Sequence, residues 1–327
     1  MTVAHEGKSS PTAETLRSIY LTIKANAFPT IWLWQITLAV GIFDTFFIAL
    51  SPHLSFSAKP VPLIFGLVGA GALLMWRLSR TQQSENLFYA RFVRCALFLI
   101  YFAPTSLCLA LLNYIVMSTK LPMADLTLDA WDRNLGFDWI SYANFVTGHR
   151  WISFILYVAY NGLMPSLAVV AMTDIATGKY KQANEFIGLV IATGIFCIVV
   201  SGLFPSYGAM KFYNIALLNK DYLGGISGQI ISQLDLVRGS LPMALDTSQM
   251  TGLSEFPSYH TVIGMLVAYG SRGSIYRFIP GLIFSTLLIA ATPFYGAHYI
   301  TDVISGAIVA VCFIAAGRRL QSRMDVA

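Results

Sequence analysis

The chain has 327 residues, of which 56% are hydrophobic and only 11% are charged. A soluble domain has about a quarter of its residues charged, so this composition excludes an ordinary soluble protein and indicates a protein that crosses a membrane several times. The net charge is +5, but no stretch is dense enough in lysine and arginine to form a nucleic-acid-binding surface, so nucleic acid is excluded as a partner.

Apolar runs along the chain predict an all-α membrane bundle of about eight transmembrane helices. The runs cover about 30–50, 61–77, 95–117, 151–173, 187–206, 258–271, 278–297 and 301–317. The second, sixth and eighth are short against the roughly 20 residues that a span usually needs. The first is too long for the core of a secretory signal and contains Asp44, so it is predicted to be a retained span. The sequence has no internal repeat and no soluble domain. It is therefore predicted to form a single membrane domain over residues 1–327.

Basic residues are distributed unevenly between the two sides of the predicted bundle. An even number of spans places both termini on one side, and that side collects Lys8, Arg17, Lys24, Arg77, Arg80, Arg91, Arg94, Lys179, Lys181, Arg272, Arg277, Arg318, Arg319 and Arg323. The other side has the longer loops but only Lys59, Lys120, Arg133, Arg150, Lys211, Lys220 and Arg238. The positive-inside rule therefore predicts that both termini are cytoplasmic, including an N-terminal tail over residues 1–28.

Two long segments lie on the predicted outer, non-cytoplasmic side. Residues 118–150 mix four aspartates with tryptophan, tyrosine and phenylalanine, which is typical of helices lying in the membrane interface, with a catalytic loop as the alternative. Residues 206–256 are polar and contain glycine, and loops of this length are often lids or binding loops. The four cysteines fall in or beside predicted spans without the paired spacing of a metal site, so we expect them to be packing residues.

Two short motifs place ionisable residues at the mouths of predicted spans. His260 lies in "FPSYHTV" at the start of the sixth span, and His298 and Asp302 lie in "GAHYITDVISG" at the start of the eighth, so the topology brings all three to the outer face. The spacing of four residues lets Asp302 contact His298 and fix its tautomer, which leaves the other ring nitrogen free to attack phosphorus. His260 could then protonate a leaving alcohol. The alternatives are histidines that only pack at the interface, and a metal site, for which the neighbouring segments offer no convincing further ligand.

The stretch "FPSYH" resembles the proline-serine-x-histidine motif of the type 2 phosphatidic acid phosphatase superfamily, and "GAHYITDVISG" is similar to its later histidine-aspartate motif. The "H-Y-x-x-D-V" form resembles especially the inositolphosphotransferase branch, which contains fungal inositol phosphorylceramide synthase, and the sphingomyelin synthases. The resemblance makes residues 187–317 the catalytic half and implies a six-helix phosphatase-like core. It implies that His298 forms a phosphohistidine, that Asp302 orients it, that His260 acts as acid and then base, and that Ser258 hydrogen-bonds a phosphate oxygen. It also implies no cofactor and no metal ion.

Three departures from the superfamily pattern bear on the substrate. The first motif, a lysine followed after six residues by arginine-proline, is absent, and Thr292 stands where the phosphatases have an arginine before the histidine. Tyr259 stands where a glycine usually precedes the histidine of the earlier motif. Fewer cations around the phosphate favour a phosphodiester over a phosphomonoester. Lys211 and Arg238 in the outer loop are the candidate phosphate ligands, beside Ser258 and Tyr259 as further substrate-binding residues.

The sequence thus predicts a membrane-embedded enzyme that moves a phosphoryl group or phospho-headgroup of a phospholipid or sphingolipid on the outer face. The acceptor is left open between water and a lipid hydroxyl, and membrane lipids are the expected partners. A transporter without lipid chemistry is the main alternative, since it explains the spans and Asp44 but leaves the paired motifs to chance. A second alternative is an intramembrane protease with Ser258 as its nucleophile. The sequence around Ser258 argues against it, because it lacks the glycine-flanked serine elbow. A purely structural membrane protein is the third alternative.

Overall fold

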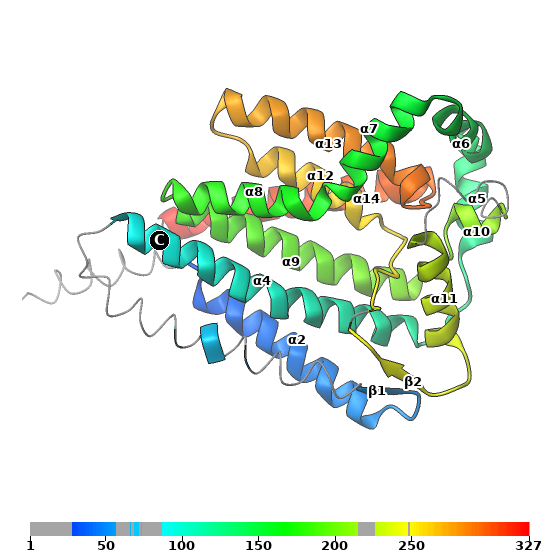
Figure 1. The fold of residues 1–327 in the computed structure, drawn as a ribbon, viewed down its shortest axis with the longest axis horizontal. Coiled ribbons are helices and arrows are strands. Elements are labelled where there is room, and N and C mark those ends of the chain that lie inside the picture. Colours follow the sequence, from blue (N-terminus) through cyan, green and yellow to red (C-terminus); the bar gives the residue numbers. More distant parts are fainter. Residues whose placement is uncertain are drawn as a thin grey trace, which may run out of the picture.

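The computed structural model describes residues 28–56, 87–214, 226–247 and 249–326, with residues 66, 69–71 and 73 between the first two ranges. These residues form a helical bundle (Figure 1). The helices are α2 (Ile31–Leu50), α4 (Leu87–Met117), α5 (Asp125–Asn134), α6 (Trp139–Gly148), α7 (Arg150–Asn161), α8 (Leu163–Ala176), α9 (Tyr180–Leu203), α10 (Ala209–Phe212), α11 (Ile226–Arg238), α12 (Tyr259–Gly270), α13 (Ile275–Tyr295) and α14 (Ile300–Val326). Two short strands, β1 (Leu54–Phe56) and β2 (Met243–Leu245), pair in parallel, with Leu54 opposite Met243.

Five helical segments of the described chain are long and apolar enough to cross a membrane. They are Ile31–Leu50, Arg91–Met117, Tyr180–Leu203, Ile275–Tyr295 and Ile300–Leu320, and the pair α7 and α8 makes a sixth if the two helices form one span bent by 52°. This confirms an all-α integral membrane protein. The predicted count of eight is not reached among these segments, because most of the run at 61–77 lies outside the described residues and α12 has only 12 residues.

The bend between α7 and α8 has a local cause. Gly162 separates the two helices, and a side chain there would come within 2.8 Å of the Phe284 ring on α13. Pro165 lies in the first turn of α8, where its missing N–H removes no intrahelical hydrogen bond. The chain therefore changes direction beside Phe284 of α13.

Helix α12 lies inside the bundle and packs against α8, α9, α13 and α14. Most of its side chains are buried, including Val262, Ile263 and Leu266. A helix enclosed by protein on all sides needs no lipid-facing length, which explains how 12 residues suffice here. Helix α2 packs on α4, and α4 packs on α8 and α9 (Figure 1).

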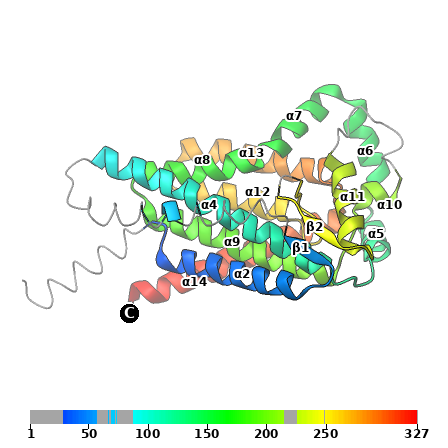
Figure 2. The same cartoon turned by 60° about the horizontal axis from the view of Figure 1, so that its bottom comes forward.

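The two ends of the bundle differ in character. At one end, Arg277 pairs with the buried carboxylate of Asp174 at 2.7 Å, and Arg272 pairs with Glu185 at 2.5 Å. At the other end α5, α6, α10, α11 and the two strands gather around the ends of the long helices (Figure 2). The loop between α13 and α14, which contains His298, lies at this second end, called the site end below.

Candidate active site

His298 lies in the short loop between α13 and α14 and is only 2% exposed. Its Nδ1 stands 3.2 Å from Oδ2 of Asp302, in the first turn of α14. The predicted contact is therefore present, although His298 precedes the helix instead of lying on it. The same Oδ2 accepts the backbone N–H of Tyr299 at 3.0 Å, so the carboxylate holds both the ring and the loop. With Nδ1 engaged, Nε2 is the ring nitrogen left for chemistry.

Glu255 is a third member of this cluster that the sequence reasoning missed. Its Oε2 lies 3.0 Å from Nδ1 of His298, and the side chain is almost completely buried. Burial, together with the nearby carboxylate of Asp302, raises the pKa of Glu255 well above its ordinary value. The residue stands three positions before Ser258 and outside both motifs, so its only signal in the sequence was an acid next to apolar residues at a span mouth.

The second histidine of the predicted pair also lies at the cluster. The ring of His260 stacks on Tyr160 of α7, with the centroids 4.6 Å apart and the planes 18° apart. Its centroid is 5.7 Å from that of His298, in an edge-on arrangement. Burial lowers the pKa of His298 to about 3, so the ring is neutral at physiological pH and its Nε2 carries a free lone pair. The structure thus brings together the three residues predicted to be catalytic.

Backbone contacts join the two motifs directly. The backbone N–H of Ser258 donates to the backbone carbonyl of Asp302 at 3.0 Å. Gly306 permits this approach, because a side chain there would meet the Ser258 carbonyl at 2.4 Å. The Ser258 hydroxyl accepts the N–H of Thr261 at 3.4 Å as the N-cap of α12 and is fully buried. Its role in the structure is that of a helix cap, and the phosphate contact stays a prediction.

The other predicted substrate-binding residues lie at different distances from the cluster. Tyr259 lines the same cavity as the histidines and donates its hydroxyl proton to the Val190 carbonyl at 2.7 Å. Lys211 instead pairs with Asp235 at 3.2 Å. The guanidinium of Arg238 donates to backbone carbonyls at the end of α4 and in the loop after it, at Met117 and Leu121. Neither of these two cations lines the cavity in the structure.

The aspartates of α5 support the loop that carries His298. Asp132 accepts the backbone N–H groups of Ile300 and Thr301 at 2.8 and 2.9 Å, which caps the start of α14. Asp125 accepts the Ser206 hydroxyl at 2.8 Å. Segment 118–150 was predicted to lie in the membrane interface. In the structure its first helix turns buried carboxylates toward the active-site loop.

Trp139 of α6 supports the same loop from another direction. Its indole N–H stands 3.1 Å from the carbonyls of both Pro293 and His298, and the side chain is 1% exposed. Gly208 shows how closely the chain packs here: its φ is +81°, and a side chain would meet the Ala297 carbonyl at 2.7 Å. The loop that presents the histidine is therefore held rigidly by α5, α6 and the segment before α10.

We expect Asp132→Asn to lower both stability and activity, because an amide replaces the charged cap of the helix that carries Asp302. Asn can still cap a helix, but its amide NH2 cannot accept the second of the two N–H groups, and a buried unsatisfied donor costs about 1–3 kcal/mol in the free energy of unfolding. Thermal unfolding in detergent and turnover of lipid substrate would be measured together. Asp138→Asn is the matched control, since Asp138 caps α6 in an exposed position; an equal loss of activity in both variants would contradict a specific role for Asp132.

Both histidines open onto a cavity of about 280 Å³ that runs between the helices. Its described lining is mainly apolar and comprises Tyr101, Phe102, Thr105, Ser106, Leu109, Ala110, Asn113, Tyr160, Met164, Leu167, Ile187, Val190, Ile191, Cys197, Ile198, Ile230, Met250, Thr251, Gly252, Ser254, Glu255, Tyr259, His260, Gly296 and His298. These residues come largely from α4, α8, α9 and α12, with Glu255 and His298 at the site end. None of the described lining residues is a lysine or an arginine.

Glu255, His298 and Asp302 are also a set of side chains whose ligand atoms lie within 4.8 Å of one another. The 3.2 Å distance from Nδ1 to Oδ2 of Asp302 is that of a hydrogen bond, whereas Oε2 of Glu255 lies 3.0 Å from the same nitrogen without a hydrogen bond. The independence from metal ions that the motifs imply stays a prediction.

A family model described as the PAP2 superfamily, that of the type 2 phosphatidic acid phosphatases, matches residues 126–316, which contain both motifs. The chain belongs to the PAP2 superfamily. This confirms the superfamily predicted from the two motifs, and it indicates a phosphatase or phosphotransferase that acts in a membrane on lipid-type substrates. No curated protein and no solved structure matches the chain. The inositolphosphotransferase branch stays a prediction. The PAP2 segment begins after α4, so α2 and α4 lie outside it.

Proposed function

We propose that this protein transfers the phosphoryl group or phospho-headgroup of a membrane lipid through a phosphohistidine at His298. The observation that carries the proposal is that His260 and His298, 5.7 Å apart, open onto one largely apolar cavity. PAP2 membership supports the reaction class. The neutral ring of His298, with Nδ1 turned to carboxyl groups, supports the choice of nucleophile.

The proposed reaction has two displacements at phosphorus. Nε2 of His298 attacks, an N–P bond forms, and the bond from phosphorus to the leaving oxygen breaks while that oxygen takes a proton from His260, which enters the step in its protonated form beside the anionic phosphate. The neutral His260 then removes a proton from the acceptor hydroxyl, whose oxygen bonds to phosphorus as the N–P bond breaks. The first histidine is restored and the proton returns to His260, so the cycle balances.

The cavity lining favours a lipid that carries little negative charge at the reacting phosphate. A phosphomonoester places up to two negative charges near the histidines, and the described lining residues supply no lysine or arginine to meet them. A phosphodiester has a single charge and fits better. The apolar walls suit a hydrocarbon chain, so a phospholipid or sphingolipid donor is proposed, with water or a lipid alcohol as acceptor.

The proposed orientation follows the charge bias of the sequence. The bundle end with Arg272 and Arg277 is assigned to the cytoplasm together with both termini, and the site end to the non-cytoplasmic face. In the structure both arginines are paired with carboxylates at the end opposite His298, which supports this assignment.

The decisive experiment incubates the purified protein in vesicles with a panel of labelled phospholipids, with and without ceramide or diacylglycerol. Mass spectrometry identifies the products. Release of free phosphate or of a soluble headgroup phosphate indicates hydrolysis, and a new phospholipid indicates transfer. Absence of any lipid product across the panel would contradict the proposed function.

The apolar cavity leads to a separate prediction on α4. Ala110→Phe should fill part of the cavity and raise KM for long-chain substrates by about tenfold or more, equivalent to about 1.4 kcal/mol. A short-chain analogue should be affected much less. Ala103→Phe is the matched control, because Ala103 is exposed on the same helix and does not line the cavity. Equal effects on long and short chains would show that the cavity does not hold the chain.

A further inference from the structure

We propose that Glu255 is a second carboxyl partner of the nucleophile: with Asp302 it positions the His298 ring and balances the charge that the ring gains when Nε2 bonds to phosphorus. The charge-balancing part rests on the proposed function. The contact between Glu255 and Nδ1 does not depend on the proposed function, so each part has its own test.

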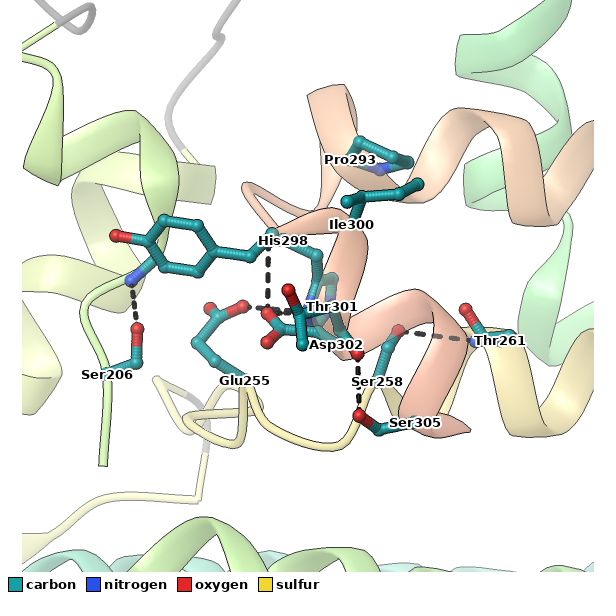
Figure 3. A network of polar contacts seen from close by, with 12 residues as sticks. Ser206, Glu255, Ser258, Thr261, Pro293, His298, Ile300, Thr301, Asp302 and Ser305 are labelled. Carbon is teal, nitrogen blue, oxygen red and sulfur yellow. Dashed lines mark hydrogen bonds and ion pairs between the residues drawn. The ribbon is translucent and has the colours of Figure 1, made fainter. Parts of the chain in front are cut away.

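The geometry places two carboxyl groups at one ring nitrogen. Oε2 of Glu255 lies 3.0 Å from Nδ1 and Oδ2 of Asp302 lies 3.2 Å from it. The two groups come from different segments, Glu255 from the stretch before α12 and Asp302 from α14, and both point to His298 (Figure 3). Oδ2 of Asp302 is shared with the N–H of Tyr299, whereas Oε2 of Glu255 has no hydrogen-bond partner among the described residues and stands 3.0 Å from Nδ1 as a close contact.

The segment that carries Glu255 is hydrogen-bonded to two transmembrane helices, α9 and α4. The backbone N–H of Glu255 donates to the Ser201 hydroxyl of α9 at 3.1 Å. Just before it, the amide of Asn113 on α4 donates to the hydroxyl of Ser254 and accepts the N–H of Leu253. These bonds hold the carboxyl at the histidine, so the contact does not depend on a freely moving loop.

Burying a carboxyl group to this extent costs free energy unless the group has an interaction partner. The titratable groups that face Glu255 are His298 from the α13–α14 loop, Asp302 from α14, Asp125 from α5 and Tyr160 from α7. None of these carries a permanent positive charge. Of these four groups, the one that can become positive is the His298 ring.

Phosphorylation of His298 creates that charge. The neutral ring has a proton on Nδ1 and a lone pair on Nε2, and bonding of Nε2 to phosphorus leaves a cationic ring with both nitrogens substituted. The cation favours the ionised form of Glu255, which releases its proton to water, so one new positive charge meets one new negative charge 3.0 Å away. Asp302 alone would stabilise the cationic ring less, because its Oδ2 also accepts the backbone N–H of Tyr299.

The kinetic test uses Glu255→Gln, which keeps the size of the side chain and removes its ability to ionise. A charge-assisted hydrogen bond made in the reaction should be worth about 10- to 100-fold in kcat, with KM nearly unchanged. Glu185→Gln is the matched control, because the Glu185 side chain is only 7% exposed and pairs with Arg272 at the opposite end of the bundle. A Glu255→Gln protein with unchanged kcat, or with the same change as the control, would overturn the proposal.

A second measurement works even if no lipid substrate is found. The chain has five histidines, so the ring N–H signals can be assigned in detergent-solubilised protein labelled with ¹⁵N-histidine, using His298→Ala to identify His298. We expect Glu255→Gln to shift the Nδ1 proton of His298, and Glu185→Gln to leave it in place. An unshifted signal would overturn the contact. A stoichiometric metal ion that the wild-type protein retains and Glu255→Gln loses would also overturn it, in favour of a metal site.

Discussion

His298→Ala is expected to reduce lipid turnover by about 10⁴-fold or more, because it removes the atom that attacks phosphorus. No other described side chain is placed to replace it: Glu255 and Asp302 face the Nδ1 side of the ring, and the ring of His260 is stacked on Tyr160. Turnover would be measured in defined vesicles with the donor lipid identified from the panel. Wild-type protein should also incorporate label from a donor labelled at phosphorus into an acid-labile form, and His298→Ala should not.

His149→Ala is the control for this variant. His149 is exposed between α6 and α7, where it bonds the Phe145 carbonyl, and its loss should leave turnover unchanged. Thermal unfolding of both variants would separate a catalytic loss from a folding defect. His298→Ala protein that is folded and retains full headgroup turnover would rule out the phosphohistidine mechanism.

Gly306→Ala is expected to have the second largest effect, because it separates the two motifs. The added methyl group would stand 2.4 Å from the Ser258 carbonyl, so α14 and the start of α12 must move apart. Overpacking of this kind costs about 1–3 kcal/mol in the free energy of unfolding. A displacement of about 1 Å between His260 and His298 can lower the rate by about 10²-fold. Thermal unfolding and kcat should therefore both fall.

Gly317→Ala on the same helix is the matched control. A methyl group there would lie 3.5 Å from Leu189, an ordinary van der Waals distance, so stability and kcat should stay close to those of the wild-type protein. If Gly306→Ala behaved like Gly317→Ala, the close contact between the motifs would not be needed for activity.

The helices α2 and α4 extend the protein beyond its PAP2 segment. Residues 126–316 contain both motifs, yet α4 contributes a wall of the cavity that includes Thr105, Leu109 and Asn113. The same helix holds the segment next to Glu255 through Asn113. The part of the chain outside the PAP2 segment therefore shapes the site, and its residues are the natural place to look for selectivity between lipid chains.

Local pattern was enough to predict several features of this protein. The low charge and long apolar runs predicted an integral all-α membrane protein, because a bilayer excludes charged and unpaired backbone groups over a length of about 20 residues. The spacing of His298 and Asp302 predicted their contact, because four residues are enough to bring side chains together along one stretch of chain. The two motifs also predicted the superfamily that residues 126–316 match.

Only the tertiary structure decided which distant residues join the two motifs. Glu255 reaches Nδ1 of His298 across 43 positions of sequence, and Asp132 caps α14 from 168 positions away. Neither contact has a periodic signal, because each depends on how separate helices pack. Packing also turned Lys211 toward Asp235 and made Ser258 a buried helix cap. A charged residue takes the partner that lies nearest to it in space, and the sequence alone does not say which residue that is.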